Sequence, residues 1–228
     1  MGHTNPKYPK MRMIGDEAGM NKKQRIPKHI AIIPDGNRRW AKTQGMEKQE
    51  GYHHGLEPGL ALLDKARKAG VQEITYYGFT VDNCKRPKEQ VEAFRQACVE
   101  AVSLLQREGA ELLVIGDDAS KCFPTELKKY RERQTIEGGG IRLNFLVNYG
   151  WSWDLSHIKE TGHPWSDDIS RIDLVIRWGG RSRLSGLLPI QSVYADIYTM
   201  DHMWPDYTDA DMDAAFDWYA KQDVTLGG

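Results

Sequence analysis

The chain has 228 residues, with 31 lysines and arginines, 32 aspartates and glutamates, and a formal net charge of −1. This balance argues against a nucleic-acid-binding protein, which usually carries a basic excess, but local arginine clusters could still bind anionic small molecules. Its length suits one domain, and its three widely spaced cysteines form no CxxC pair, which argues against a disulfide framework or zinc site and favours the cytoplasm.

Strand-like and helix-like segments alternate along the chain, which predicts βαβ units and a mostly parallel sheet. The first 28 residues are polar and contain no apolar segment of signal-peptide length. We therefore interpret residues 1–28 as a flexible arm and residues 29–228 as one domain. The apolar runs are too short to span a bilayer. Six strands are predicted, over residues 29–34, 73–79, 111–115, 141–147, 172–177 and 195–199.

Helices are predicted where apolar residues recur at helical spacing. Leucines at 56, 60 and 63 favour a helix over residues 51–69, and Pro87, suited to a first helical position, opens a long helix to about residue 108. A short charged helix over 124–133 and a last helix over 209–222 complete the set, and glycines 138–140 form a turn. The prediction is a single α/β domain with a central six-stranded, mostly parallel sheet flanked by helices.

The segment Pro34–Trp40 (PDGNRRW) follows the first predicted strand and precedes a helix. Ligands bind beyond the carboxyl ends of parallel strands, where a helix N-terminus offers N–H groups to a phosphate. Arg38 and Arg39 add bidentate anion donors, and Asp35 could hold Mg²⁺ that bridges phosphate oxygens. The alternative is structural, with Asp35 capping the helix and the arginines solvated. Spacing alone does not separate these two interpretations.

Two more polar loops follow predicted strands. Residues 79–87 (FTVDNCKRP) follow the second strand, and this loop could equally be a plain connection capped by Asp82 or Asn83. Residues 177–185 (RWGGRSRLS) follow the fifth strand and combine three arginines, two serines and two glycines, a composition that favours anion binding. Because the three loops follow parallel strands, they should converge at one edge of the sheet, which predicts a substrate with one or more diphosphates.

Asp196 lies in the last predicted strand, within the segment ADIY. A carboxylate on a buried strand is costly unless it is paired or bound to a metal. Pairing with one of the arginines above and a role in metal or substrate binding are both open for Asp196.

In sequence order, these segments resemble the signatures of cis-prenyltransferases, the undecaprenyl diphosphate synthase family. HIAIIPDGNRRWAKTQG resembles HxAIIMDGNxRWAKxxG, residues 76–87 resemble YAFSxENWxRP, and residues 173–185 resemble DLVIRTGGExRxSxF. The resemblance runs from about residue 27 to the end of the chain. Further blocks match at residues 51–55, 114–117, 148–150, 194–198 and 204–206.

The resemblance implies an enzyme, usually a homodimer, that joins an allylic prenyl diphosphate to isopentenyl diphosphate with a cis double bond. It implies Mg²⁺ as cofactor with Asp35 and Asp196 as metal residues, and Asp35 and Asn37 as catalytic residues. A cytoplasmic enzyme peripheral to the membrane is expected, because the prenyl product could associate with lipid, and no nucleic acid is expected as partner. The implied substrate-binding residues are Gly36, Arg38, Arg39, Trp40, Lys48, Tyr52, Phe79, Thr80, Asp82, Arg86, Arg177, Arg183 and Ser185.

Several positions depart from the family pattern, and they concern the acceptor more than the allylic donor. Tyr52 replaces a histidine, Lys48 an arginine, Cys84 a tryptophan, and Arg181 a glutamate. Irregular coupling of prenyl units, or transfer to another acceptor, is therefore an alternative to the cis condensation. A non-catalytic partner subunit and a prenyl diphosphate phosphatase are further alternatives. Because Asp35 is kept, the non-catalytic alternative is disfavoured.

Overall fold

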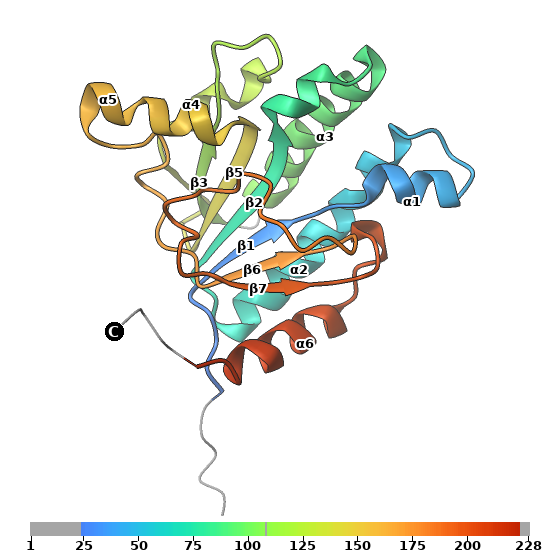
Figure 1. The fold of residues 1–228 in the computed structure, drawn as a ribbon, viewed down its shortest axis with the longest axis vertical. Helices are drawn as coiled ribbons and strands as arrows, with labels where there is room; N and C mark the ends of the chain where they lie inside the picture. The colour runs from blue at the N-terminus through green and yellow to red at the C-terminus, as the bar shows by residue number, and fades with distance from the viewer. Residues whose placement is uncertain (1–23, 108, 224–228) are drawn as a thin grey trace, which may run out of the picture.

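The computed structural model describes residues 24–107 and 109–223. One sheet forms its centre, with strand order β4-β3-β5-β2-β1-β6-β7 (Figure 1). All neighbouring strands pair in parallel except β3 and β4, which are antiparallel. The strands are β1 (His29–Ile33), β2 (Glu73–Thr80), β3 (Ala110–Ile115), β4 (Gln134–Ile136), β5 (Ile141–Tyr149), β6 (Leu174–Arg177) and β7 (Asp196–Thr199).

The predicted α/β class with a mostly parallel sheet is confirmed, but the sheet has seven strands rather than six. The missed strand, β4, is a three-residue edge strand whose side chains are exposed or half-buried. It has no buried face, so its sequence carries no apolar alternation from which a strand could be predicted. The glycines at 138–140, predicted to form a turn, connect β4 to β5 with φ angles of 85°, 82° and 130°. Positive φ is the conformation that glycine adopts without steric cost.

The described residues also form six α-helices and four short 3₁₀ segments. The helix predicted over residues 51–69 begins as a 3₁₀ turn, and the one predicted over 124–133 is entirely 3₁₀. Within the described residues, no helix combines the length and apolar character needed to cross a membrane. The α-helices are α1 (Asn37–Thr43), α2 (Leu56–Ala69), α3 (Lys88–Gln106), α4 (Trp151–Ser156), α5 (Ile158–Thr161) and α6 (Asp209–Ala220), and the 3₁₀ segments are η1 (Glu50–Gly55), η2 (Val81–Lys85), η3 (Thr125–Tyr130) and η4 (Trp204–Asp206).

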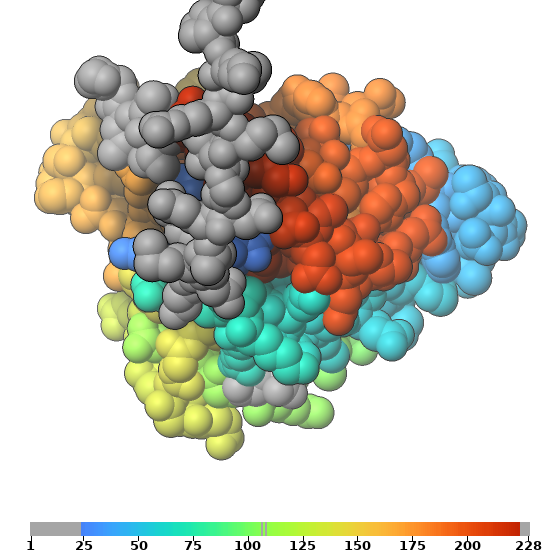
Figure 2. Space-filling view, turned by 90° about the horizontal axis from the view of Figure 1, so that it is seen from below, coloured from blue at the N-terminus to red at the C-terminus, as the bar shows by residue number. Residues whose placement is uncertain are grey.

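Two apolar cores lie on opposite faces of the sheet, because successive side chains of a strand point to opposite sides. Ile30 and Ile32 of β1 join the larger core, beneath α2, α3 and α6. Ala31 and Ile33 join the smaller core, to which Ile169, Leu187 and Trp153 also belong or pack. Seen from below, α2 and α6 lie side by side (Figure 2). Since both faces of β1 are buried, its sequence is continuously apolar rather than alternating.

The last residues of the predicted flexible arm are fixed against the domain. Arg25 donates a hydrogen bond to the carbonyl of Gln222 at 3.0 Å, and its guanidinium lies 4.0 Å from the ring centroid of Tyr219 on α6. Ile26 packs against the larger core. Residues 24–28 therefore belong to the folded part of the chain, which corrects the predicted boundary; residues 1–23 of the arm lie outside the described residues.

The sheet changes direction at β1. The chain leaves β1 to form β2 on one side of it, and later returns to form β6 on the other side. In doubly wound sheets, ligands bind outside the carboxyl ends of the strands at such a switch point. The topology therefore predicts a ligand site at the loops that follow β1, β2 and β6.

Candidate active site

A broad polar pocket of about 1680 Å³, counted out to open solvent, lies at the carboxyl ends of β1, β2 and β6. The three basic loops predicted to converge all contribute to its lining. Thirteen of the predicted site residues line it, namely Asp35, Gly36, Asn37, Arg38, Arg39, Lys48, Tyr52, Thr80, Asp82, Arg86, Arg177, Arg183 and Ser185.

Asp35 lies at the base of the pocket, just beyond the end of β1. One carboxylate oxygen accepts a hydrogen bond from Arg177 Nη2 at 2.8 Å, and the other lies 3.5 Å from Arg39 Nη2. A third of its side-chain surface remains exposed. Asp35 is therefore held by two cations yet open to the pocket, where it can also contact a ligand.

Arg177 connects the loop after β1 to the loop after β6. Besides its bond to Asp35, its Nη1 donates hydrogen bonds to Ser185 Oγ at 2.9 Å and to the carbonyl of Arg183. Its side chain is only 4% exposed. Arg177 thus positions Asp35 and the 183–185 segment relative to each other, a role that its sequence position did not reveal.

Asn37 lies where the polar pocket meets an apolar cavity, and it lines both. Its Nδ2 donates a hydrogen bond to the carbonyl of Pro34 at 2.9 Å. Its Oδ1 is buried and has no hydrogen-bond partner within the described part of the chain. Because a buried polar atom without a partner is costly, this oxygen marks a place where a bound ligand can complete the site.

Gly36 makes the turn from β1 into α1 with φ of 113°. A Cβ at this position would lie 2.7 Å from Met203 Cβ, so both the backbone conformation and the space require glycine. The turn places Asn37, Arg38 and Arg39 in succession beside the pocket.

Arg86 and Tyr52 form the wall opposite Asp35. Arg86 Nη1 donates a hydrogen bond to the Tyr52 hydroxyl at 3.0 Å, and the Tyr52 ring stacks on Phe94 with centroids 4.5 Å apart. Burial raises the pKa of Tyr52, so it stays protonated, and burial lowers the pKa of Arg86 from its ordinary very high value. Tyr52, at a position where the family resemblance expects histidine, therefore holds the Arg86 guanidinium in place.

The segment after β6 forms the other wall. Tyr77 donates a hydrogen bond to the carbonyl of Ser185 at 2.8 Å, and burial raises the pKa of Tyr77 to about 12. Ser185 adopts φ of 54°, a conformation unusual for a serine, which the bonds from Arg177 and Tyr77 maintain. Arg181 and Arg183 extend from this segment as exposed side chains, and neither forms an ion pair within the described residues.

The pocket carries a strong excess of positive charge. Eight lysines and arginines line it, against two aspartates, Asp35 and Asp82. Asp82 is largely exposed and paired with Lys85 at 2.7 Å, so it offsets little of this charge. Such an excess favours an anionic ligand with several charges. The basic residues are Arg38, Arg39, Lys42, Lys48, Arg86, Arg177, Arg181 and Arg183.

Two predicted substrate-binding residues, Trp40 and Phe79, do not line either cavity. Trp40 is on the opposite side of α1, where its Nε1 donates a hydrogen bond to Asp206 Oδ1 at 2.7 Å and its ring packs on His54. Phe79 is completely buried in the larger core, with its ring against Phe94. Both side chains support the site from behind, because strand and helix periodicity point them away from the pocket.

Asp196 is not brought to Asp35 within this chain. It begins β7 and pairs in register with Leu174, whereas the carboxyl end of β6, at Arg177, pairs with Thr199 and Ile33. Asp35 therefore lies about five strand residues farther along, roughly 16 Å away. Because β7 is a partly exposed edge strand, the carboxylate of Asp196 can stay solvated and needs no partner.

Four polar or charged residues of the pocket, and Tyr77, Phe94 and Met203 beside them, were not among the predicted site residues. Lys42 and Thr43 follow the first motif by one helical turn, so helical spacing from Arg38 and Arg39 could have indicated them. Arg181 was counted among the three arginines of the loop after β6 and noted as a departure from the family pattern, but it was not predicted as a site residue. Tyr77, Phe94 and Met203 carry no local signal, since only packing brings them to the pocket, and Asn83 is the fourth polar residue.

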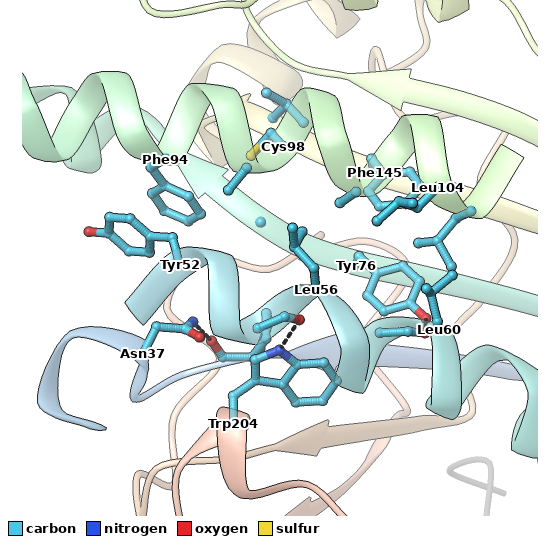
Figure 3. A pocket seen from close by; sticks show the side chains of 18 residues that line it. Asn37, Tyr52, Leu56, Leu60, Tyr76, Phe94, Cys98, Leu104, Phe145 and Trp204 are labelled. Atoms are coloured by element: carbon cyan, nitrogen blue, oxygen red, sulfur yellow. Dashed lines mark hydrogen bonds between the residues drawn. The ribbon is translucent and has the colours of Figure 1, made fainter. Parts of the chain in front are cut away.

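An apolar cavity adjoins the polar pocket, and Figure 3 shows the side chains that line it. It lies between α2, α3 and the sheet. Pro34, Asn37, Tyr52, Gly78 and Phe94 line both the cavity and the pocket, so the two spaces are continuous. A ligand with an anionic head and a hydrocarbon tail would fill both.

The carboxylates of the pocket fit Mg²⁺ only together with substrate oxygens. Within the described residues, no three histidine, cysteine, aspartate or glutamate side chains lie close enough together to hold a metal ion. Mg²⁺ is commonly bound by one or two carboxylates plus substrate phosphates and water. Asp35, which is partly exposed beside the arginines, suits that kind of ligand set.

Comparisons with known proteins agree with this geometry. The family model described as "Putative undecaprenyl diphosphate synthase" matches residues 33–227. Ditrans,polycis-undecaprenyl-diphosphate synthase ((2E,6E)-farnesyl-diphosphate specific) from Aliivibrio fischeri is 32% identical, covering 89% of each chain. The enzyme of the same name from Escherichia coli K12 is 31% identical, over 88% of this chain and 90% of its own.

A solved structure supports the fold. Lavandulyl diphosphate synthase from Lavandula x intermedia, in complex with dimethylallyl diphosphate, aligns with a TM-score of 0.69 over 89% of this chain and 99% of that one, at 24% identity. The match of the family model over most of the chain, together with the curated relatives, shows that this chain belongs to the undecaprenyl diphosphate synthase family and is a cis-type prenyltransferase.

Proposed function

We propose that this enzyme ionises an allylic prenyl diphosphate with the help of Mg²⁺ and transfers the prenyl group to isopentenyl diphosphate. The observation that carries the proposal is the junction at Asn37, where a pocket lined by eight cations opens into an apolar cavity. A diphosphate would lie among the cations and its hydrocarbon tail in the cavity. The bond that breaks, between the allylic carbon and oxygen, would then lie at the junction.

Residues of the first two loops would hold the allylic donor. Arg39, Arg86 and Thr80 border the pocket near Asp35, within reach of a diphosphate whose tail enters the cavity. Mg²⁺, when bound through Asp35, would supply neutralisation of negative charge on the departing diphosphate. The fixed guanidinium groups would do the same without reorganising during the reaction, which is the most effective form of electrostatic catalysis.

Asn37 would act at the reacting carbon. Its unpartnered Oδ1 lies between the pocket and the cavity, so it is suited to face the positive charge that develops on the allylic group as the diphosphate departs. The buried position strengthens this interaction, because few water molecules compete there.

The segment after β6 would hold the acceptor. Arg181 and Arg183 are exposed side chains without an ion pair among the described residues, and Ser185 lies beside them with its backbone fixed by Tyr77 and Arg177. An acceptor diphosphate held here would direct its hydrocarbon end toward Asn37. The prenyl group would then add to the acceptor double bond, and loss of a proton would complete the condensation.

We also infer a homodimer in the cytoplasm. β7 is an edge strand of the sheet, and Ile190, Val193, Tyr194 and Ile197 on or before it expose between 40% and 67% of their surface. A second copy of the chain would cover these side chains. The three free cysteines are compatible with a reducing compartment, and association of the product with the membrane would follow from its hydrocarbon chain.

The test is a product assay with purified protein, Mg²⁺, labelled isopentenyl diphosphate and a series of allylic diphosphates. Incorporation of label into an acid-labile prenyl diphosphate would support the proposal. Consumption of the allylic diphosphate without label would indicate irregular coupling or, if only the free alcohol forms, hydrolysis. Absence of any consumption, with tight binding to another family member, would indicate a non-catalytic subunit.

A further inference from the structure

The indole ring of Trp151 packs against the segment that would hold the acceptor. A Cβ built on Gly186 would lie 2.7 Å from Trp151 Cδ1 and 3.6 Å from the Tyr77 hydroxyl, so the edge of the indole lies directly against the Gly186 backbone. Gly186 follows Ser185 in the chain and has φ of 82°. Glycine is therefore needed at this position both for its backbone conformation and for the space that the ring occupies.

Trp151 is attached to a rigid part of the molecule. It is the first residue of α4, which follows the carboxyl end of β5 at the end of the sheet where the pocket lies (Figure 1). The completely buried carboxylate of Asp154 accepts hydrogen bonds from the Tyr149 hydroxyl at 2.7 Å and from the Ser166 amide and hydroxyl at 2.9 and 2.7 Å. Because these bonds fix α4 to β5 and to the chain around Ser166, the ring has a fixed base.

The backbone that the ring touches needs such support. Ser185, Gly186 and Leu188 adopt φ of 54°, 82° and 30°. For serine and leucine this region is sparsely populated, and it persists only where the surrounding structure maintains it. The Tyr77 hydroxyl holds Ser185 through its carbonyl, and the Trp151 ring contacts the next residue. Both side chains therefore bear on the same strained turn.

The ring can act on the acceptor only through this turn. Trp151 is not one of the described residues that line the polar pocket, whereas Arg183 and Ser185 are. It is also 54% exposed, so its removal forfeits little apolar burial and should cost little stability. An effect of Trp151 on the acceptor can therefore be measured separately from an effect on the fold.

We propose that Trp151 is a positioning residue for the acceptor, because its ring holds residues 183–186 in the conformation in which Arg183 and Ser185 face the pocket. The inference rests on the proposed function, which places the acceptor diphosphate on this segment. Without the ring, the segment would occupy other conformations, and the apparent affinity for the acceptor would fall with the fraction of molecules that remain competent. The donor, which the first two loops would hold, should bind as before.

Removal of the ring gives the first test. Trp151→Ala leaves a good helix former at the start of α4. We expect the KM for isopentenyl diphosphate to rise about five- to tenfold, with kcat and the donor KM within about twofold of wild type, because saturating acceptor restores the competent conformation. Trp151→Phe keeps an aromatic ring beside Gly186 and should recover most of the loss. Urea denaturation should show near-normal stability for both variants.

Gly186→Ala tests the contact from the other side. The added Cβ would meet the indole, and the positive φ would be strained for alanine. Only the first of these effects depends on Trp151. The rise in acceptor KM caused by Gly186→Ala should therefore be about threefold or more smaller in the Trp151→Ala background than in the wild-type protein. Equal rises in the two backgrounds would overturn the inference.

Trp165→Ala is the matched control. Trp165 is a second partly exposed tryptophan of the same region, but it stacks on Trp153 and His157. Its removal should leave the acceptor KM unchanged. A rise as large as that in Trp151→Ala would mean that any loss of packing in this region affects the acceptor, and the specific role of Trp151 would then be wrong.

Hydrogen exchange gives a readout that needs no turnover. The Leu187 amide donates to the carbonyl of Leu184 at 3.1 Å and so reports on the turn. In Trp151→Ala we expect this amide to exchange about tenfold faster, with exchange in β6 unchanged, because the turn opens locally. Unchanged exchange at Leu187, or an unchanged acceptor KM, would overturn the inference and leave the proposed function intact. If no donor is consumed, the proposed function is wrong, and the exchange rate still decides whether the ring holds the turn.

Discussion

The two ends of the sheet use arginine in opposite ways. At the amino end, Arg133 and Arg142 both bind Asp168, with contacts of 2.6 and 3.0 Å, and Arg142 also reaches the buried carboxylate of Glu73. At the carboxyl end, eight cations share a pocket with two aspartates, and Arg181 and Arg183 lack an ion pair within the described residues.

The difference shows that the number of carboxylates near the arginines, rather than the number of arginines, distinguishes an anion-binding site from a structural network of ion pairs. At the amino end Arg133 and Arg142 are both matched by carboxylates, so these two cations are already neutralised within the protein. At the carboxyl end the folded chain brings like charges together at an energetic cost, which a multiply charged anion can remove. Function is therefore expected where the charges are unbalanced, and stability where they are balanced.

The largest expected effect is a loss of activity at the unbalanced end. Asp35→Asn keeps an acceptor for Arg177 but removes the charge that would bind Mg²⁺. We expect Mg²⁺-dependent turnover to fall by about a hundredfold or more, as when one electrostatic catalytic group is removed. The free energy of unfolding should change little. Steady-state rates across a Mg²⁺ titration measure the turnover. Urea denaturation measures the free energy of unfolding.

The matched substitution at the balanced end should have the opposite result. Glu73→Gln removes a buried charge that accepts hydrogen bonds from Asn144, Ser170 and Arg142. We expect a loss of about 2 kcal/mol in the free energy of unfolding, with near-normal turnover per folded molecule. The contrast between the two ends would be contradicted if Glu73→Gln lost much of its activity per folded molecule. It would also be contradicted if Asp35→Asn lost stability but kept its turnover.

A smaller effect is expected from the exposed arginines of the pocket. Arg183→Ala should raise the KM for the acceptor by about tenfold or more, corresponding to about 1.5–3 kcal/mol for a lost charged hydrogen bond. The KM for the allylic donor should stay near normal, and Arg183→Lys should recover part of the loss. The proposed division of the pocket would be wrong if the donor KM rose instead.

The smallest expected effect is a pH dependence of stability from His29, at the balanced end. His29 is 2% exposed; its Nδ1 donates to the carbonyl of Ser170 at 3.0 Å, so its Nε2 accepts from the Thr75 hydroxyl at 2.8 Å. Burial lowers the pKa of His29, although the nearby charge of Glu73 opposes that shift. The neutral ring is therefore the form that the folded protein favours.

The unfolded chain binds more protons at this position than the folded protein does, once the pH is below the pKa of an exposed histidine, about 6.5. The contribution of His29 is thus fully present above that pH and is lost as the pH falls toward its lower folded pKa. Urea denaturation between about pH 7 and 5 should show this slope in the wild-type protein and in His163→Gln, an exposed control, but a smaller slope in His29→Gln. An equal slope in all three would contradict the assignment.

Much of the site could be predicted from the sequence because its signals are local. The apolar run at residues 29–33 and the motif that follows it predicted a strand and the loop at its carboxyl end. The corresponding patterns predicted β2 and β6 and the loops that follow them. In a parallel sheet such loops share one edge, so the convergence of Asp35, Arg86 and Arg183 followed without knowledge of the strand order.

The direction in which a side chain points, and how deeply it is buried, could not be predicted from its position along the chain. Trp40 and Phe79 lie within the predicted motifs, yet their side chains pack behind the site, because neighbours distant in sequence, Asp206 and Phe94, receive them. Asp196 was expected near Asp35, and only the register of β7 against β6 revealed that they lie at opposite ends of the sheet.

The sequence by itself determined the α/β class, the family, and the loops that bear the charge, since strand and helix periodicity and contiguous motifs are local properties. Only the tertiary structure decided which arginines are already paired, that Arg177 connects Asp35 to Ser185, and that Asn37 lies where the polar pocket meets the apolar cavity. Those features are contacts between segments far apart in the chain. They exist only once the sheet register and the packing of the helices have been fixed, because a side chain's partner is set by three-dimensional proximity and not by its neighbours in sequence.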